Sequence, residues 1–442
     1  MIKRDDNPRL DSVEKLSRAP SSRRVFLNRT LAVAGVSSLG QLPNRLKAAE
    51  QSSRPLFEGY AITPQKNVQE ATLAQPADGV YWLLFGERER MVKKVSTDGG
   101  RTWSGLIPLQ STDGLGIPTN RNTAHQTLLR LRSGNLGLIY GGPHARTGRD
   151  GTVLYRVSAD AGKTWGSPIV VDPLFALCRN GSVRVLRSGR IVAPTLKWIS
   201  PAAGPESESE DKQMVFSWIY YSDDEGKTWH RSLSELFISL DGGEHGFYSF
   251  DEPVLEELDD NHLLMVGRTQ LGRPYRSFSK DGGISWSNPA PVNLASSDSP
   301  HTLIRVPSTR DLLIVWNQTS TEECLTGLMR HRLSTAISSD DGETWGHFRN
   351  LESLDDRSYI EPPAAKPQVY LMRDERYIEP TDHQRYPHAP GCLRNCYSTV
   401  TFSKDEVAFA YDYGFGGPGE LQNGSATKIQ VATLHWLYGE QP

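Results

Sequence analysis

The chain has 442 residues, and its formal net charge of −3 is unevenly distributed. Residues 1–49 hold ten basic and four acidic side chains, so the rest of the chain carries a net charge of −9. A mildly acidic body argues against nucleic acid or an anionic membrane as the main partner. No later stretch approaches the ~20 apolar residues of a membrane span, so we expect no integral membrane segment in the mature chain.

The first segment has the pattern of an export signal. Residues 22–27 read Ser-Arg-Arg-Val-Phe-Leu, which matches the twin-arginine motif, and a modestly apolar run from Thr30 to Gly40 follows. Small residues at Ala48 and Ala49 suit cleavage. We predict a twin-arginine signal peptide at residues 1–49, with residues 50–442 periplasmic or secreted. A disordered basic tail is the alternative interpretation.

Five copies of one short motif, Ser-x-Asp-x-Gly-x-Thr/Ser-Trp, recur about every 60 residues, which indicates a repeat architecture. The Asp can accept hydrogen bonds from backbone N–H groups a few residues on, and the Gly allows a left-handed turn. The Trp then buries a large apolar area against its neighbour. The copies begin at Ser96, Ser158, Ser222, Ser279 and Ser338.

Six segments alternate apolar and polar residues around a short polar turn, which is typical of β-hairpins. In the first five units the Asp-containing turn follows the hairpin, which gives a four-stranded antiparallel sheet per unit. The sequence therefore predicts an all-β fold, a six-bladed β-propeller. The sixth unit lacks the repeated turn, and we expect residues 428–437 to form its closing strand. The hairpins are residues 71–85, 127–140, 182–194, 253–266, 302–316 and 398–411.

Three insertions interrupt the repeats, at residues 200–212, 241–248 and 351–396, and the last has the length of a functional loop. It contains His383, His388, Cys392 and Cys396, residue types that suit zinc, but their spacing matches no common zinc pattern. We therefore expect no metal and no cofactor, and either a disulfide or ordinary loop residues here. With Cys178 and Cys324 the chain has four cysteines, whose pairing the sequence leaves open.

Polar residues occupy the point where each predicted inner strand begins. In a propeller these points converge at one end of the axis, so the six side chains should surround a shared depression. Each of them can bond a ligand, which predicts a binding or catalytic site; a solvated polar mouth without chemistry is the alternative. The ring consists of Glu70, His125, Asn180, Glu252, His301 and Tyr397.

Several stretches resemble the sialidase (neuraminidase) superfamily, in which the repeated turns are known as Asp boxes or BNR repeats and are structural. Residues 251–258, followed by Arg268, resemble the sialidase segment with a catalytic Glu and then a substrate-binding Arg. Residues 330–338 resemble the segment with another binding Arg, and residues 397–401 the segment with the nucleophilic Tyr. The resemblance spans about residues 57 to 437.

The resemblance implies a retaining exo-glycosidase that acts on terminal acidic sugars such as sialic acid, with a glycan or glycoconjugate as its partner. Tyr397 would be the nucleophile and Glu252 would accept its proton, because a phenol with a pKa near ~10 needs a base at neutral pH. A neutral phenol also approaches an anionic sugar without like-charge repulsion. Arg268 and Arg330 would hold the substrate carboxylate, and His125, Asn180 and His301 would complete the binding site.

The sequence departs from the sialidase pattern at two places. Glu70 stands where the family has the first arginine of a triad, and residues 86–90 contain no Asp where the family has its acid/base. A carboxylate at position 70 repels an acidic sugar unless it is protonated or paired. By position Glu70 is a better candidate for the acid than Glu89, and Arg276 is interpreted as a solvent-exposed strand residue.

Two alternative functions therefore stay open. One is a propeller that acts on another sugar, as a hydrolase or a polysaccharide lyase. The other is a non-catalytic glycan-binding propeller, since a fold does not fix a function.

Overall fold

The computed structural model describes residues 60–61, 70–119, 125–142, 152–173, 178–199, 214–243, 246–259, 261–325, 328–364, 393–415 and 424–439. The chain divides into Met1–Arg45 and Leu46–Pro442, and the described residues belong to the second unit. The predicted twin-arginine segment and the insertion at residues 200–212 lie outside the described residues. Within those ranges no helix is long and apolar enough to cross a membrane.

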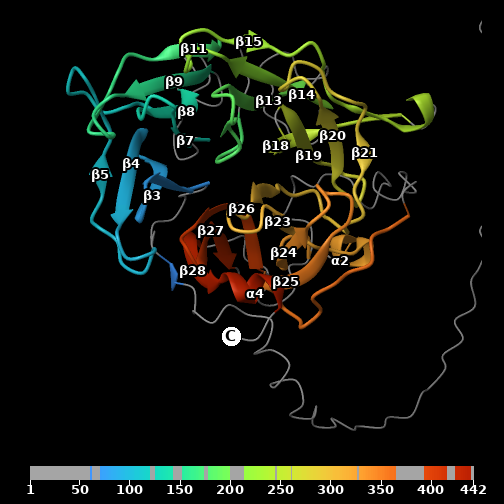
Figure 1. The fold of residues 1–442 in the computed structure, drawn as a ribbon. Helices are drawn as coiled ribbons and strands as arrows, with labels where there is room; N and C mark the ends of the chain where they lie inside the picture. Colours follow the sequence, from blue (N-terminus) through green and yellow to red (C-terminus); the bar gives the residue numbers. More distant parts are fainter. Residues whose placement is uncertain are drawn as a thin grey trace, which may run out of the picture. The chain divides into compact units, whose positions relative to one another are not determined.

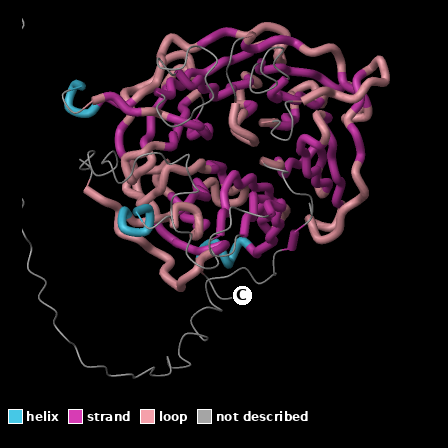
Figure 2. Tube along the Cα trace, turned by 180° about the vertical axis from the view of Figure 1, so that it is seen from behind, coloured by secondary structure: helices cyan, strands magenta, loops and turns pink. Residues whose placement is uncertain are grey.

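The second unit is a six-bladed β-propeller, as predicted. Six four-stranded antiparallel sheets follow one another in chain order around a common centre (Figure 1). Seen from behind, the same strands surround that centre and the few helical turns lie at the periphery (Figure 2). All six predicted hairpins are present as the two innermost strands of a blade.

The strands of each of the first five blades follow chain order from the innermost to the outermost. They are β2 (Thr72–Ala77), β3 (Val80–Glu87), β4 (Arg90–Ser96) and β5 (Ile107–Pro108) in blade 1; β7 (Thr127–Arg130), β8 (Leu136–Gly142), β9 (Thr152–Ser158) and β11 (Ile169–Asp172) in blade 2; β12 (Arg184–Val185), β13 (Ile191–Ile199), β14 (Met214–Ser222) and β15 (His230–Arg231) in blade 3; β18 (Asp251–Asp259), β19 (His262–Arg268), β20 (Tyr275–Ser279) and β21 (Ala290–Pro291) in blade 4; and β22 (Thr302–Arg305), β23 (Leu312–Asn317), β24 (Leu333–Ser338) and β25 (Gly346–Glu352) in blade 5. The connections add β6 (Gln110–Ser111), β10 (Thr164–Trp165), β16 (Ile238–Ser239), β17 (Phe247–Tyr248), η2 (Leu240–Gly243) and α2 (Thr321–Leu325).

Blade 6 joins the two ends of the propeller. It contains β26 (Leu393–Phe402), β27 (Glu406–Phe415), β28 (Gly424–Thr433) and, as its outermost strand, β1 (Tyr60–Ala61) from the start of the unit. The prediction of a closing strand at residues 428–437 is wrong at both ends. The strand begins at Gly424, and after Thr433 the chain forms α4 (Leu434–Tyr438), because the Thr433 side chain caps this helix by accepting a hydrogen bond from Trp436 N.

Buried apolar side chains form one cluster at each of the six junctions between neighbouring blades. Successive side chains of a strand point to opposite faces of its sheet, so one strand supplies two junctions. In β3, Leu83 packs in the cluster shared with blade 6 and Leu84 in the cluster shared with blade 2. Both are fully buried, and the alternating pattern of the sequence therefore explains how the blades hold together.

The Asp boxes form closed turns between the third and fourth strands. In the fifth box Asp340 Oδ1 accepts a hydrogen bond from Thr344 N at 2.8 Å, and Ser338 Oγ accepts one from Gly342 N at 2.8 Å. Gly342 has a φ of 88°, a conformation that other residues rarely adopt. The turn also receives a cation from the preceding blade, since Arg276 Nη1 donates to Gly342 O at 2.6 Å. The Arg276 side chain is only 17% exposed, so the expectation of a solvent-exposed residue is wrong.

Replacing the box aspartate should destabilise the fold without touching the ring. We expect Asp340→Ala to lower the free energy of unfolding by about 1–2 kcal/mol, because the Thr344 N–H and Ser338 hydroxyl lose their acceptor. Chemical denaturation would measure this. Ser339→Ala, one residue earlier on the same exposed turn, is the control, and equal unfolding midpoints for the two variants would contradict the role of the aspartate.

Candidate active site

Four of the ring residues lie just before an inner strand, whereas Glu252 lies near the start of β18 and Tyr397 lies within β26. The backbone of the six ring residues is unusual. Five of them are buried and Tyr397 is half-buried. Four have positive φ angles, which are uncommon for residues other than glycine and persist only where the surroundings hold them. These are Glu70 at 59°, His125 at 45°, Glu252 at 40° and Tyr397 at 52°.

β-Bulges set the orientation of two of these side chains, Glu252 and Tyr397. The pairing of β18 with β19 shifts register between Asp251 and Val254, and the pairing of β26 with β27 shifts between Cys396 and Thr399. Such bulges reorient a side chain at the cost of local ladder bonds. Glu252 and Tyr397 each lie inside one of them, so the same device positions the predicted base and nucleophile.

Glu252 is paired with Arg268, which in turn is held by a second carboxylate. Arg268 Nη1 donates to Glu252 Oε2 at 2.7 Å, and Arg268 Nε donates to Asp298 Oδ1 at 2.5 Å. Burial alone would raise the pKa of Glu252, but the positive charges of Arg268, Arg179 and Arg330 together lower it. Glu252 is therefore ionised at neutral pH and can accept a proton.

Arg330 lies beside Tyr397, with its guanidinium carbon 5.7 Å from the centre of the phenol ring. Its other contacts are neutral, because Nε donates to Ser299 Oγ at 3.1 Å and Nη1 to Cys396 Sγ at 3.3 Å. Burial raises the pKa of Tyr397 well above its usual range, and the charges of Glu252 and Glu70 raise it further. The phenol is thus protonated at neutral pH, and both carboxylates lie within its electrostatic reach.

Glu70 is paired with His125 across the first two blades. Glu70 Oε2 lies 2.5 Å from His125 Nδ1, and both side chains are about nine-tenths buried or more. The main chain of Glu70 is fixed as well, since its N–H donates to Asp412 Oδ1 at 2.9 Å and its carbonyl accepts from Gln126 Nε2 at 2.8 Å. The Glu70 carboxylate therefore has His125 as a close partner.

His301 and Asn180 complete the ring from blades 5 and 3. Burial, reinforced by the charge of Arg179, lowers the pKa of His301 to about 3, so its imidazole is neutral. Among the residues that the structure describes, His301 Nδ1 and Asn180 Oδ1 find no hydrogen-bond partner, although both are buried. Buried polar atoms in proteins normally find a partner, so these two atoms suit a polar ligand or water.

Glu89, the other candidate for the acid, does not join this cluster. Glu89 is exposed in the turn between β3 and β4, where it has a φ of 62°. His383, His388 and Cys392 lie outside the described residues. Cys178, Cys324 and Cys396 are buried thiols. Among the described residues, no group of three or more His, Cys, Asp or Glu side chains could hold a metal ion.

Sequence reasoning missed Asp298 and Arg179. Asp298 pairs with the substrate-binding candidate Arg268, and Arg179 is a fully buried guanidinium beside Asn180. Both lie within three residues of a ring position in the chain. A charged residue close before a ring residue is the signal in the sequence that marks both.

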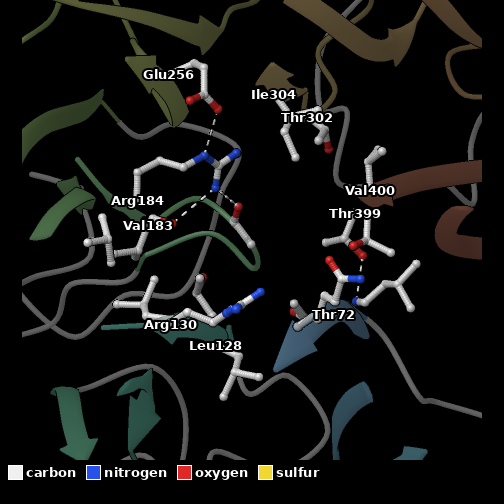
Figure 3. Close-up of a pocket in the computed structure, with 18 of the residues that line it drawn as sticks. Thr72, Leu128, Arg130, Val183, Arg184, Glu256, Thr302, Ile304, Thr399 and Val400 are labelled. Carbon is white, nitrogen blue, oxygen red and sulfur yellow. Dashed lines mark hydrogen bonds and ion pairs between the residues drawn. The ribbon is translucent and has the colours of Figure 1, made fainter. Parts of the chain in front are cut away.

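A pocket of about 360 Å³ follows the axis beyond the ring and is lined by the inner strands. Its wall carries the hydroxyl groups of Thr72, Thr302 and Thr399, and Arg184 points across it toward Glu256 (Figure 3). Arg184 Nε donates to Glu256 Oε2 at 3.0 Å, so these two charges satisfy each other. The groups suited to acid–base chemistry are therefore concentrated in the ring.

Comparison with known proteins agrees with this architecture. Residues 118–374 match the family described as the BNR repeat-like domain. A protein of unknown function from Dyadobacter fermentans superposes with a TM-score of 0.55 at 16% identity, over 86% of this chain and 99% of that one.

Two sialidases share the fold at low identity. Trypanosoma rangeli sialidase in complex with sialic acid has a TM-score of 0.52 at 18% identity, over 87% of this chain but only 57% of that one. The NanB sialidase from Streptococcus pneumoniae has a TM-score of 0.50 at 10% identity, over 86% of this chain and 71% of that one. With the family match covering more than half of its length, the chain belongs to the BNR repeat-like domain family and has the sialidase-like six-bladed propeller fold.

Proposed function

We propose that the chain is a retaining exo-glycosidase that hydrolyses terminal sugars of the sialic-acid type in the ring. The observation that carries this proposal is that Tyr397, held with a positive φ, lies beside Arg330 and within electrostatic reach of Glu252. These residue types are what a tyrosine-nucleophile glycosidase requires.

In the first step the Tyr397 oxygen forms a bond to the anomeric carbon while the bond to the leaving oxygen breaks. The phenolic proton passes to Glu252, because the new bond withdraws electrons from the phenol oxygen. The leaving oxygen takes the proton held between Glu70 and His125. In the second step a water oxygen bonds to the anomeric carbon while the bond from that carbon to the Tyr397 oxygen breaks. The water proton passes to the Glu70–His125 pair, and the released Tyr397 oxygen takes its proton back from Glu252.

Two features of the charge distribution support an acidic sugar. The contacts of Arg330 with Ser299 and Cys396 are neutral, so its positive charge is available to a substrate carboxylate. The pairing of Glu70 with His125 reduces the repulsion expected from a carboxylate at the position of the missing arginine. Arg268 pairs with Glu252 and Asp298, so its charge is already partly balanced before a substrate carboxylate binds to it.

Hydrolysis of a fluorogenic α-sialoside by the purified protein tests this proposal. Proton NMR of the first-formed sugar should show that the anomeric configuration is retained. Inversion would remove the covalent mechanism. Glycan binding without turnover would instead support a binding propeller, and an unsaturated product from a uronic-acid polysaccharide would support a lyase.

A further inference from the structure

Arg179 is a buried cation whose presence the proposed mechanism does not explain. The residue is 1% exposed and lies directly before the ring residue Asn180. Within the described part of the chain its hydrogen bonds go only to neutral oxygens: Ser398 O at 3.0 Å, Thr302 Oγ1 at 3.3 Å and Asn180 O at 3.3 Å. Burying a charge without a carboxylate partner destabilises the folded state. The presence of Arg179 therefore needs an explanation other than stability.

The guanidinium reaches across the axis to the peptide that follows the predicted nucleophile. It extends from blade 3 to Thr302 in blade 5 and to Ser398 in blade 6. The Ser398 carbonyl accepts hydrogen bonds from both Arg179 Nη2 and Thr302 Oγ1. This carbonyl follows Tyr397, whose φ of 52° lies in a bulge. Two donors therefore hold the backbone at the point where its conformation is unfavourable.

The same guanidinium acts on the charged groups of the ring. Its positive charge is one of those that lower the pKa of Glu252, and it contributes after burial to the lowered pKa of His301. Glu252 and Glu70 in turn are the carboxylates that favour the charged form of Arg179 against its burial. Arg179 therefore contributes positive potential to the site from a position that solvent does not reach.

We propose that Arg179 is a positioning residue for the ring, which fixes the backbone at Tyr397 and adds a buried positive charge to the site. Its positive charge partly replaces the positive charge of the arginine that the sialidase pattern has at the position of Glu70. The inference rests on the proposed function for the roles of Tyr397 and Glu252, and its test therefore includes a measurement that needs no turnover.

The kinetic test uses Arg179→Met, Arg179→Lys and Thr302→Val with the fluorogenic α-sialoside. We expect Arg179→Met to lower kcat about 100-fold with KM changed less than about threefold, because the lost interaction acts on the reacting groups. The acidic limb of the pH profile should move to higher pH, since Glu252 loses a neighbouring cation. Arg179→Lys should return that limb toward its original position, whereas Thr302→Val should lower kcat about fivefold without moving it.

Arg156→Met is the matched control, because Arg156 is also buried and also binds only neutral oxygens, Tyr140 Oη at 2.8 Å and Gly166 O at 2.5 Å. It lies in β9, away from the ring, and its pH profile should equal that of the wild type. The inference would be overturned if the acidic limb of the pH profile stayed in place in Arg179→Met. It would also be overturned if that variant changed KM and left kcat as in the wild type.

A fluorine probe separates this inference from the proposed function. 3-Fluorotyrosine at position 397 should report the titration of Glu252 by fluorine NMR, with an inflection at higher pH in Arg179→Met than in Arg156→Met. Should Arg179→Met not fold, the fluorine signal must still shift in Thr302→Val, because that variant removes one of the two donors to Ser398 O. Unchanged signals would refute the positioning role even in a protein without glycosidase activity.

Discussion

Tyr397→Phe is expected to lower kcat for a fluorogenic α-sialoside by about 10³-fold or more, because the variant lacks the oxygen that forms the covalent intermediate. The substitution keeps the aromatic ring beside Arg330, and we expect the free energy of unfolding to change by less than about 0.5 kcal/mol. Steady-state kinetics and chemical denaturation of the same preparation would measure both quantities.

Tyr275→Phe provides the matched control for this variant. Tyr275 is a buried tyrosine of β20 whose hydroxyl has no hydrogen-bond partner among the described residues. Its substitution by Phe also deletes a single oxygen. Its activity should equal that of the wild type. Turnover that survives in Tyr397→Phe would eliminate the tyrosine mechanism and leave the ring with a different reaction or with binding alone.

The fold was predictable because its signals are local. Each hairpin and each Asp box is encoded within about 15 residues, and the alternation of Leu83 and Leu84 between two junctions follows from the pleat of one strand. The closure of blade 6 was not predictable in this way. Tyr60 pairs with Ile429, which lies in a distant part of the chain. A strand of two residues is too short to show an alternating pattern in the sequence. The helix at Leu434–Tyr438 is likewise too short to show a helical period.

The location of the ring was predictable by counting strand positions, but the partners of its residues were not. Arg268 finds Asp298 in the next connection, Glu70 N finds Asp412 in blade 6, and Arg179 finds Ser398 across the axis. Arg276 shows the same limit, since its acceptor belongs to the Asp box of the following blade. Local sequence patterns determine the position of a residue on its strand. Its interaction partners depend on how the six blades close around the axis.

Glu252→Gln should give the second large loss of activity, because the amide cannot accept the phenolic proton. We expect kcat to fall about 10²–10⁴-fold, and the acidic limb of the pH profile to disappear with the group that titrates there. The fold should persist, since Arg268 keeps its ion pair with Asp298 at 2.5 Å.

The stability difference between this variant and the wild type should depend on pH. Neighbouring arginines hold the pKa of Glu252 below its unfolded value of about 4.3, so its stabilising contribution is present above that pH. The contribution is lost as the pH falls through the lower, folded pKa. The wild type should therefore be more stable than Glu252→Gln at pH 7, and the gap should narrow as the pH falls below about 4.

Glu256→Gln distinguishes the base from a merely structural carboxylate in the same strand. Glu256 also forms an ion pair with an arginine, at 3.0 Å to Arg184, but it lines the axial pocket beyond the ring (Figure 3). Its loss should lower stability while leaving kcat within about threefold of the wild type. Equal losses of kcat in the two variants would mean that Glu252 acts only through the fold, and the proton from Tyr397 would then need another acceptor.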